Sequence, residues 1–130
     1  MGTVILDSSV LIGLMDTSDV HHAAARQAVR NLDLDDVCIP ASVVAEVLVS
    51  TARHQPTQLA SVKDHIAASF GRTRVIDDDV AMAAAQLRAQ HRSLRLPDAL
   101  VIATGIVDDA SVILTGDARW DGIDERVQLL

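Results

Sequence analysis

Four acidic side chains of this sequence each stand where a predicted strand ends or a predicted helix begins. They are Asp7, Glu46, Asp98 and Asp117. Carboxylates packed together repel one another and raise each other's pKa values unless a cation lies among them. Oxygen ligands without His or Cys select Mg²⁺ or Mn²⁺ rather than Zn²⁺. Because such an ion activates water and stabilises charge on a phosphate, these residues indicate phosphoryl-transfer chemistry.

Asp7 comes directly after the apolar run at residues 3–6, which predicts a strand buried on both faces of a parallel sheet. Ligands of open α/β sheets bind outside the carboxyl ends of the strands, which is where Asp7 stands. The alternative is that Asp7 or Ser8 only caps the helix expected at residues 8–15. The arrival of further acids at comparable positions favours a site.

Glu46 lies in a helix that we expect at residues 41–54, after a short strand at 37–39. The chain contains sixteen aspartates and only two glutamates, so this Glu is not explained by composition. It is a long acid in a position to reach back towards the strand ends. The alternative is a solvated helix face, because polar residues recur around Glu46 at helical spacing.

Asp98 falls in the first turn of a helix that Pro97 begins, and a wholly apolar stretch at 99–103 follows it. Capping of that helix is the alternative role for Asp98. Asp117 comes after a strand expected at residues 111–114, and Asp121 is its substitute if Asp117 points away. Both acids therefore have positions from which they could join Asp7.

The remaining elements connect these positions. We expect helices from a turn at 16–19 to about residue 32, at 57–70 and at 77–92, a turn at Asp33–Asp36, and further strands at 73–76 and 127–130. This alternation of strands and helices predicts one α/β domain spanning residues 1–130.

Composition limits the possible functions. The formal net charge of −7 argues against a nucleic-acid partner, although divalent ions bound by an acidic cluster would offset much of it. Phe70 and Trp120 are the only aromatic residues apart from His, which argues against a stacking platform for single-stranded nucleic acid. The N-terminus has no signal-peptide or transmembrane pattern, so we expect a cytoplasmic protein with no membrane partner.

The whole chain resembles a PIN domain and, more closely, the VapC toxin ribonucleases of bacterial type II (VapBC) toxin-antitoxin systems. The resemblance rests on four segments, at residues 6–12, 45–47, 95–103 and 115–120. It implies a three-layer α/β/α sandwich with a parallel five-stranded sheet in the order 3-2-1-4-5. In that order Asp7 and Asp117 flank the topological switch point, which is where the strand-end argument expects a site.

The resemblance also implies an endoribonuclease that uses Mg²⁺, with Mn²⁺ as a substitute, and leaves 5′-phosphate and 3′-hydroxyl ends. Asp7 and Asp98 would be the inner metal ligands. Glu46 and Asp117 would complete the ligand shell through water or hold a second ion. Whether one ion or two are bound stays open.

Substrate contacts are expected from polar and basic residues near these acids. Ser9 and Thr115 would orient carboxylates or bind phosphate. Because the protein is acidic, affinity for RNA would come from the metal and from local arginines, for which we expect Arg53, Arg92 and Arg95.

The resemblance further implies a cognate VapB-type antitoxin, whose basic C-terminal segment could lie across the acidic cleft, and a homodimer formed by the helices at 41–70. One alternative is a PIN domain that no longer cuts and acts as an RNA- or protein-binding module. A receiver-like domain would need an acidic pair after the first strand and a Lys after the last, but the only lysine is Lys63. A haloacid-dehalogenase-type phosphatase would need Asp where Ser9 stands.

Overall fold

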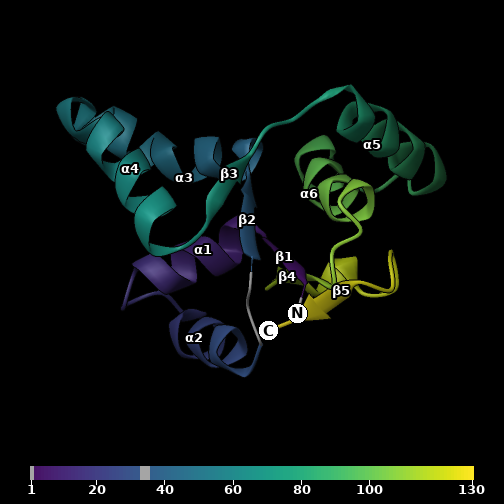
Figure 1. The fold of residues 1–130 in the computed structure, drawn as a ribbon, viewed down its shortest axis with the longest axis horizontal. Helices are drawn as coiled ribbons and strands as arrows, with labels where there is room; N and C mark the ends of the chain where they lie inside the picture. The colour runs from purple at the N-terminus through teal and green to yellow at the C-terminus, as the bar shows by residue number, and fades with distance from the viewer. Residues whose placement is uncertain (1, 33–35) are drawn as a thin grey trace.

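One parallel sheet of five strands organises the computed structural model, which describes residues 2–32 and 36–130 (Figure 1). The strands are β1 (Thr3–Leu6), β2 (Asp36–Pro40), β3 (Arg72–Arg74), β4 (Val112–Thr115) and β5 (Val127–Leu129). They lie in the order β3-β2-β1-β4-β5, and every neighbouring pair is parallel. This confirms the expected α/β fold and strand order. From β1 the chain adds β2 and β3 on one side, and it then returns to add β4 and β5 on the other side of β1. The carboxyl ends of β1 and β4 are therefore the topological switch point.

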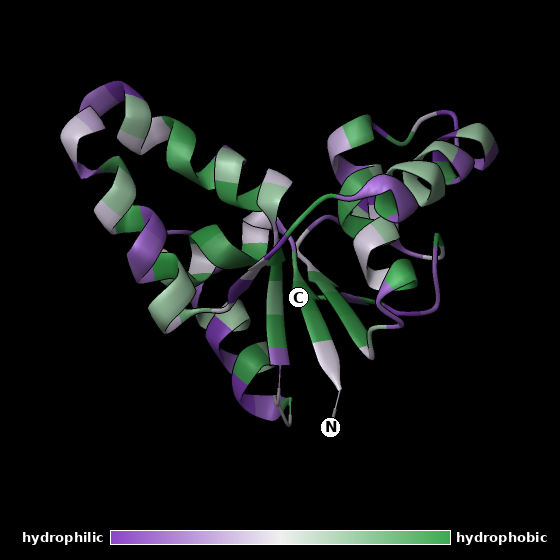
Figure 2. Cartoon of the chain, turned by 45° about the horizontal axis from the view of Figure 1, so that its top comes forward, coloured by the Kyte–Doolittle hydropathy of each residue, from purple (hydrophilic) through white to green (hydrophobic). Residues whose placement is uncertain are grey.

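Helices flank the sheet on two sides (Figures 1 and 2). They are α1 (Ser8–Met15), α2 (His22–Asn31), α3 (Ala41–His54), α4 (Leu59–Ser69), α5 (Asp78–Gln90) and α6 (Leu96–Val107), with short 3₁₀ turns η1 (Pro56–Gln58) and η2 (Ala118–Trp120). Helices α1 to α4 gather on one side of the sheet, and α5 and α6 pack together on the other. Within residues 2–32 and 36–130, no helix has the length and apolar character needed to cross a membrane.

The core lies where the central strands meet α1 and α6. Ile5 in β1, Ile113 in β4 and Ile102 in α6 are fully buried. Helix α6 comes unusually close to β4 at Gly105, because a Cβ at this position would overlap the side chain of Ile113. The strands β1 and β4 contain no charged residue, which is expected where helices cover both faces of a parallel sheet.

Some boundaries differ from the sequence predictions. The third strand is Arg72–Arg74 rather than 73–76, since its partner β2 ends at Pro40 and Val75 beyond it is 67% exposed. The helix predicted at 57–70 is divided, with η1 preceding α4. The turn predicted at Asp33–Asp36 lies largely outside the described residues, and Asp36 itself begins β2.

Candidate functional site

Asp7 joins the end of β1 to the start of α1. Its backbone N–H donates to the carbonyl of Leu114 in β4, at 3.0 Å, so it stands at the switch point between the two strands. Its Oδ1 accepts a 2.7 Å hydrogen bond from the backbone N–H of Ser8 and thereby caps α1. The capping role considered from the sequence is therefore real, but it occupies only one of the two carboxylate oxygens.

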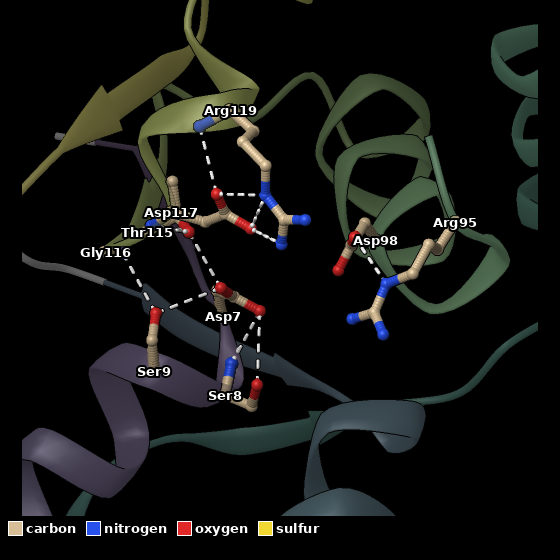
Figure 3. Close-up of polar contacts among 9 residues, drawn as sticks. All are labelled: Asp7, Ser8, Ser9, Arg95, Asp98, Thr115, Gly116, Asp117 and Arg119. Carbon is tan, nitrogen blue, oxygen red and sulfur yellow. Dashed lines mark hydrogen bonds and ion pairs between the residues drawn. The ribbon is translucent and has the colours of Figure 1, made fainter. Parts of the chain in front are cut away.

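Two hydroxyl groups hold the other oxygen of Asp7 (Figure 3). Thr115 Oγ1 donates to Oδ2 at 2.7 Å, and Ser9 Oγ donates to the same oxygen at 3.0 Å. Each hydroxyl also accepts a backbone N–H from the loop after β4: that of Asp117 on Thr115, and that of Gly116 on Ser9. These bonds fix the Asp7 carboxylate and the loop that carries Asp117 relative to each other.

Burial dominates the electrostatics of Asp7, whose exposed fraction is 7%. Loss of hydration raises the pKa of its carboxyl above the ordinary value. Hydrogen bonds from Thr115, Ser8 and Ser9 lower that pKa in part, and the negative charge of Asp98 raises it further. The ionised form of Asp7 is thus destabilised by burial and by a second carboxylate close enough to repel it.

Asp98 enters the site from the first turn of α6. Its side chain is 15% exposed and accepts a long hydrogen bond, 3.4 Å, from Nε of Arg95, whose own side chain is 67% exposed. An ion pair with so much solvent on one side holds weakly. Asp98 therefore has one loose partner and lies opposite Asp7 (Figure 3).

Asp117 is engaged by Arg119. The guanidinium donates through Nη2 to Oδ2 at 2.7 Å and through Nε to Oδ1 at 3.0 Å, and the Arg119 backbone N–H donates to Oδ1 as well. These contacts lower the pKa of the Asp117 carboxyl. Asp7 and Asp117 thus follow neighbouring strands, but the pKa of Asp7 is raised and the pKa of Asp117 is lowered.

The other residues named from the sequence lie further out. Glu46 is exposed on α3, Arg53 is exposed in its last turn, and Arg92 and Asp121 are exposed in loops. The described part of the chain brings together no group of three His, Cys, Asp or Glu side chains that could hold a metal ion. The structure therefore associates Asp7 with Asp98, and it holds Asp117 beside them in a separate ion pair.

The sequence reasoning missed Arg119. Its place two residues after Asp117, inside the short turn η2, was the available signal, because a side chain two residues on from a capping acid can fold back over it. Ser9 and Thr115 were expected to orient carboxylates or bind phosphate, and both donate to Asp7. The sequence did not indicate that Thr115 is fully buried or that its hydroxyl also accepts the backbone N–H of Asp117.

A parallel α/β sheet with carboxylates at its switch point defines a class of site, and comparison with known proteins gives the family. The PIN domain model matches residues 4–126, so the chain belongs to the PIN domain family. A search of curated proteins found no significant match.

Solved structures share the fold. A toxin-antitoxin complex from Klebsiella pneumoniae matches with a TM-score of 0.75 and 24% identity over 96% of this chain and 95% of that chain. FitAcB from Neisseria gonorrhoeae gives 0.73 and 21% over 95% of each. The sarcin-ricin-loop-cleaving toxin VapC20 of Mycobacterium tuberculosis gives 0.71 and 19%, over 94% of this chain and 97% of that one. At these identities the likeness establishes the fold.

Proposed function

We propose that this PIN domain is a metal-dependent endoribonuclease toxin, neutralised by a cognate antitoxin. One observation carries the proposal: Asp7 is a buried carboxylate with a raised pKa, fixed by two hydroxyls at the switch point and facing Asp98. Two carboxylates in this relation are stabilised by a shared cation. The names of the structural neighbours support the same reading, since VapC20 is described as cleaving the sarcin-ricin loop and the Klebsiella protein as part of a toxin-antitoxin complex.

The donor chemistry of the site fits Mg²⁺ or Mn²⁺. Asp7 and Asp98 offer only oxygen ligands, and a hard divalent ion between them would relieve their repulsion. A bound ion would activate the attacking water and stabilise charge on the phosphate. In this proposal Asp7 and Asp98 are the inner ligands, and Ser9 and Thr115 keep the Asp7 carboxylate in one orientation.

Glu46 and Asp117 have a secondary place in the proposal. Glu46 is exposed on α3, and in this proposal it would reach the ion through water or hold a second one. Asp117 becomes available when Arg119 releases it. Cleavage by water would leave a 5′-phosphate and a 3′-hydroxyl on the RNA.

The proposed partners follow from the same reading. A VapB-type antitoxin with a basic C-terminal segment would cover the carboxylates and exclude RNA, and the protein would act in the cytoplasm. A homodimer would form through α3 and α4, where Val49 and Leu59 are exposed apolar residues.

The test is cleavage of total RNA by the purified protein in Mn²⁺ and in EDTA, with the cut ends mapped. Asp98→Asn removes one proposed ligand, and Asp78→Asn makes the same chemical change on an exposed acid of α5. We expect metal-dependent cleavage that Asp78→Asn retains. Asp98→Asn should lose it by a factor on the order of 100 or more, because a bound metal contributes several kcal/mol to such reactions.

Each other outcome has a definite meaning. A folded protein that binds Mn²⁺ but cuts no RNA would replace the proposal with the RNA- or protein-binding module considered above. Cleavage that continues in EDTA would contradict the metal dependence or reveal a contaminating nuclease. Equal cleavage by Asp98→Asn and Asp78→Asn would show either the same contamination or that Asp98 is not part of the reacting site.

A further inference from the structure

A side chain from the start of α2 packs against the loop that carries Asp117. It belongs to His21, the partly buried residue that directly precedes α2. A Cβ added to Gly116 would lie 3.0 Å from Cε1 and 3.1 Å from Nε2 of the His21 ring. Both distances are shorter than the optimal separation of non-bonded heavy atoms, about 3.5–4.0 Å. The imidazole therefore occupies the space that a side chain at position 116 would need.

This one side chain accounts for two glycines. A Cβ on Gly13, in α1, would lie 3.2 Å from Cβ of His21 and 3.3 Å from Cβ of Ala25. Neither Gly13 nor Gly116 has a positive φ, so the backbone conformation does not require glycine at either position. Glycine is moreover disfavoured inside a helix such as α1. The chain thus lacks a side chain at two distant positions, and at both of them His21 takes up the space.

The backbone of His21 is held from its own side of the contact. Its N–H donates to Oδ2 of Asp19 at 2.8 Å, and its carbonyl accepts the N–H of Ala25 at 2.8 Å in the first turn of α2. Within residues 2–32 and 36–130, neither ring nitrogen of His21 has a hydrogen-bond partner. The imidazole is therefore held by packing, and it acts on Gly116 through its shape.

Gly116 is connected to Asp7 through one hydroxyl group. The Gly116 N–H donates to Ser9 Oγ at 2.9 Å, and this Oγ donates to Asp7 Oδ2 at 3.0 Å (Figure 3). A serine hydroxyl has a single hydrogen to donate, and accepting the Gly116 N–H leaves that hydrogen directed at Asp7. The position of Gly116 therefore affects how firmly the Asp7 carboxylate is held.

We infer that His21 is a positioning residue of the carboxylate site. Its ring holds Gly116 against Ser9, so that Ser9 keeps its hydroxyl on Asp7 and the carboxylate keeps one orientation towards a divalent ion. The inference rests on the proposed metal-dependent function, and it adds a residue that lies outside the switch point. The role depends on the bulk of the ring rather than on its charge.

Hydrogen exchange of the Gly116 amide tests the first step in EDTA, without any metal. At a temperature well below Tm, His21→Ala should make this amide exchange about fivefold faster, which corresponds to the loss of one neutral hydrogen bond. His54→Ala is the control, because it removes an exposed imidazole at the end of α3. It should leave the exchange rate of Gly116 unchanged.

Mn²⁺ binding, measured from the EPR signal of the free ion, tests the second step. Outer partners of metal ligands contribute about 10–100-fold to metal affinity, so His21→Ala should weaken Mn²⁺ binding by a factor of about ten. In a Ser9→Ala background the same substitution should have little further effect, because the connection from Gly116 to Asp7 is already broken.

An exchange of bulk between two positions separates positioning from general destabilisation. Gly116→Ala alone should weaken Mn²⁺ binding, because its methyl group displaces the imidazole. In the His21→Ala variant the same methyl group enters the emptied space, so Gly116→Ala should there restore part of the affinity. A loss of stability alone would not reverse the sign of this effect, and Tm is recorded for every variant.

Three results would overturn the inference. They are an exchange rate at Gly116 that His21→Ala leaves unchanged, faster exchange with unchanged Mn²⁺ affinity, and a Gly116→Ala loss of equal size with and without the imidazole. The first two leave the proposed function intact. A wild-type protein that binds no Mn²⁺ would instead contradict the proposed function and, with it, the positioning role, while the exchange rate would still show whether His21 holds the loop.

Discussion

The hydroxyl of Thr115 should stabilise the fold mainly through the charge of Asp7. Thr115→Val removes this hydroxyl with little change of shape at a position that is fully buried. The variant loses the 2.7 Å bond to Asp7 Oδ2 and leaves the backbone N–H of Asp117 without its acceptor. Thr104→Val is the matched control, because Thr104 is equally buried but donates to the neutral carbonyl of Leu100 at 2.7 Å.

The two substitutions should differ in cost. A hydrogen bond to a charged group is worth about 2 kcal/mol and an orphaned, partly buried N–H costs about 1 kcal/mol, so Thr115→Val should lose about 3 kcal/mol at neutral pH. Thr104→Val loses one neutral bond, about 1 kcal/mol, because the Leu100 carbonyl keeps its helical partner. For a chain of 130 residues, 1 kcal/mol corresponds to roughly 4 °C in Tm, which predicts falls of about 12 °C and about 4 °C.

The pH dependence of the unfolding free energy tests whether the charge of Asp7 causes the larger loss in Thr115→Val. The Thr115 hydroxyl favours ionised Asp7, so its loss raises a folded-state pKa that burial already holds above the unfolded value. In the Thr115→Val variant, the Asp7 carboxylate therefore takes up a proton at a higher pH than in the wild type. Its deficit in unfolding free energy is largest at neutral pH and shrinks as the pH falls through this window.

Thermal and urea unfolding in EDTA, from acidic to neutral pH, measure both effects. The Thr104→Val deficit should stay constant over the same range. Equal deficits for the two variants at neutral pH, or a Thr115→Val deficit that does not change with pH, would refute the assignment of this bond to the charge of Asp7.

Three further substitutions test other parts of the fold and site. Asp7→Asn should raise the Tm at neutral pH in EDTA, because a buried acid with a raised pKa destabilises the fold once ionised, and it should abolish any rise in Tm caused by Mn²⁺. Gly105→Ala should cost about 1–3 kcal/mol in urea unfolding, since its Cβ overlaps Ile113. Arg74→Gln should cost about 3 kcal/mol by leaving the largely buried Asp108 unpaired, and adding Asp108→Asn should recover part of the loss.

The sequence predicted the sheet and the positions of its acids because both depend on local signals. A short apolar run such as residues 3–6 is typical of a strand buried on both faces of a parallel sheet, and an acid directly after such a strand lies at its carboxyl end. The start of α6 at Leu96–Pro97 is set by proline geometry in the same local way. Elements of this kind were found to within one or two residues.

The contacts of long side chains could not be predicted in that way. Whether Asp117 faces Asp7 or Arg119 depends on rotamers in a turn of three residues, and sequence spacing allows both. Glu46 has the right helix for a role in the site, but its exposure depends on how α3 is rotated against the sheet. The end of β3 likewise depends on a partner strand far away in sequence, because Pro40 ends the ladder that Arg74 joins.

Because the pKa of Asp7 is raised and that of Asp117 is lowered, the acids would bind a metal ion in a definite order. An ion between Asp7 and Asp98 removes a repulsion and displaces only the long contact from Arg95, so binding there gains free energy at once. Recruiting Asp117 requires breaking two short hydrogen bonds from Arg119. Asp117 is thus held back from an ion by a cost that neither Asp7 nor Asp98 carries. Under the proposed function, Asp7 and Asp98 would therefore bind the ion first, and the ion pair with Arg119 would make Asp117 the last carboxylate to join them.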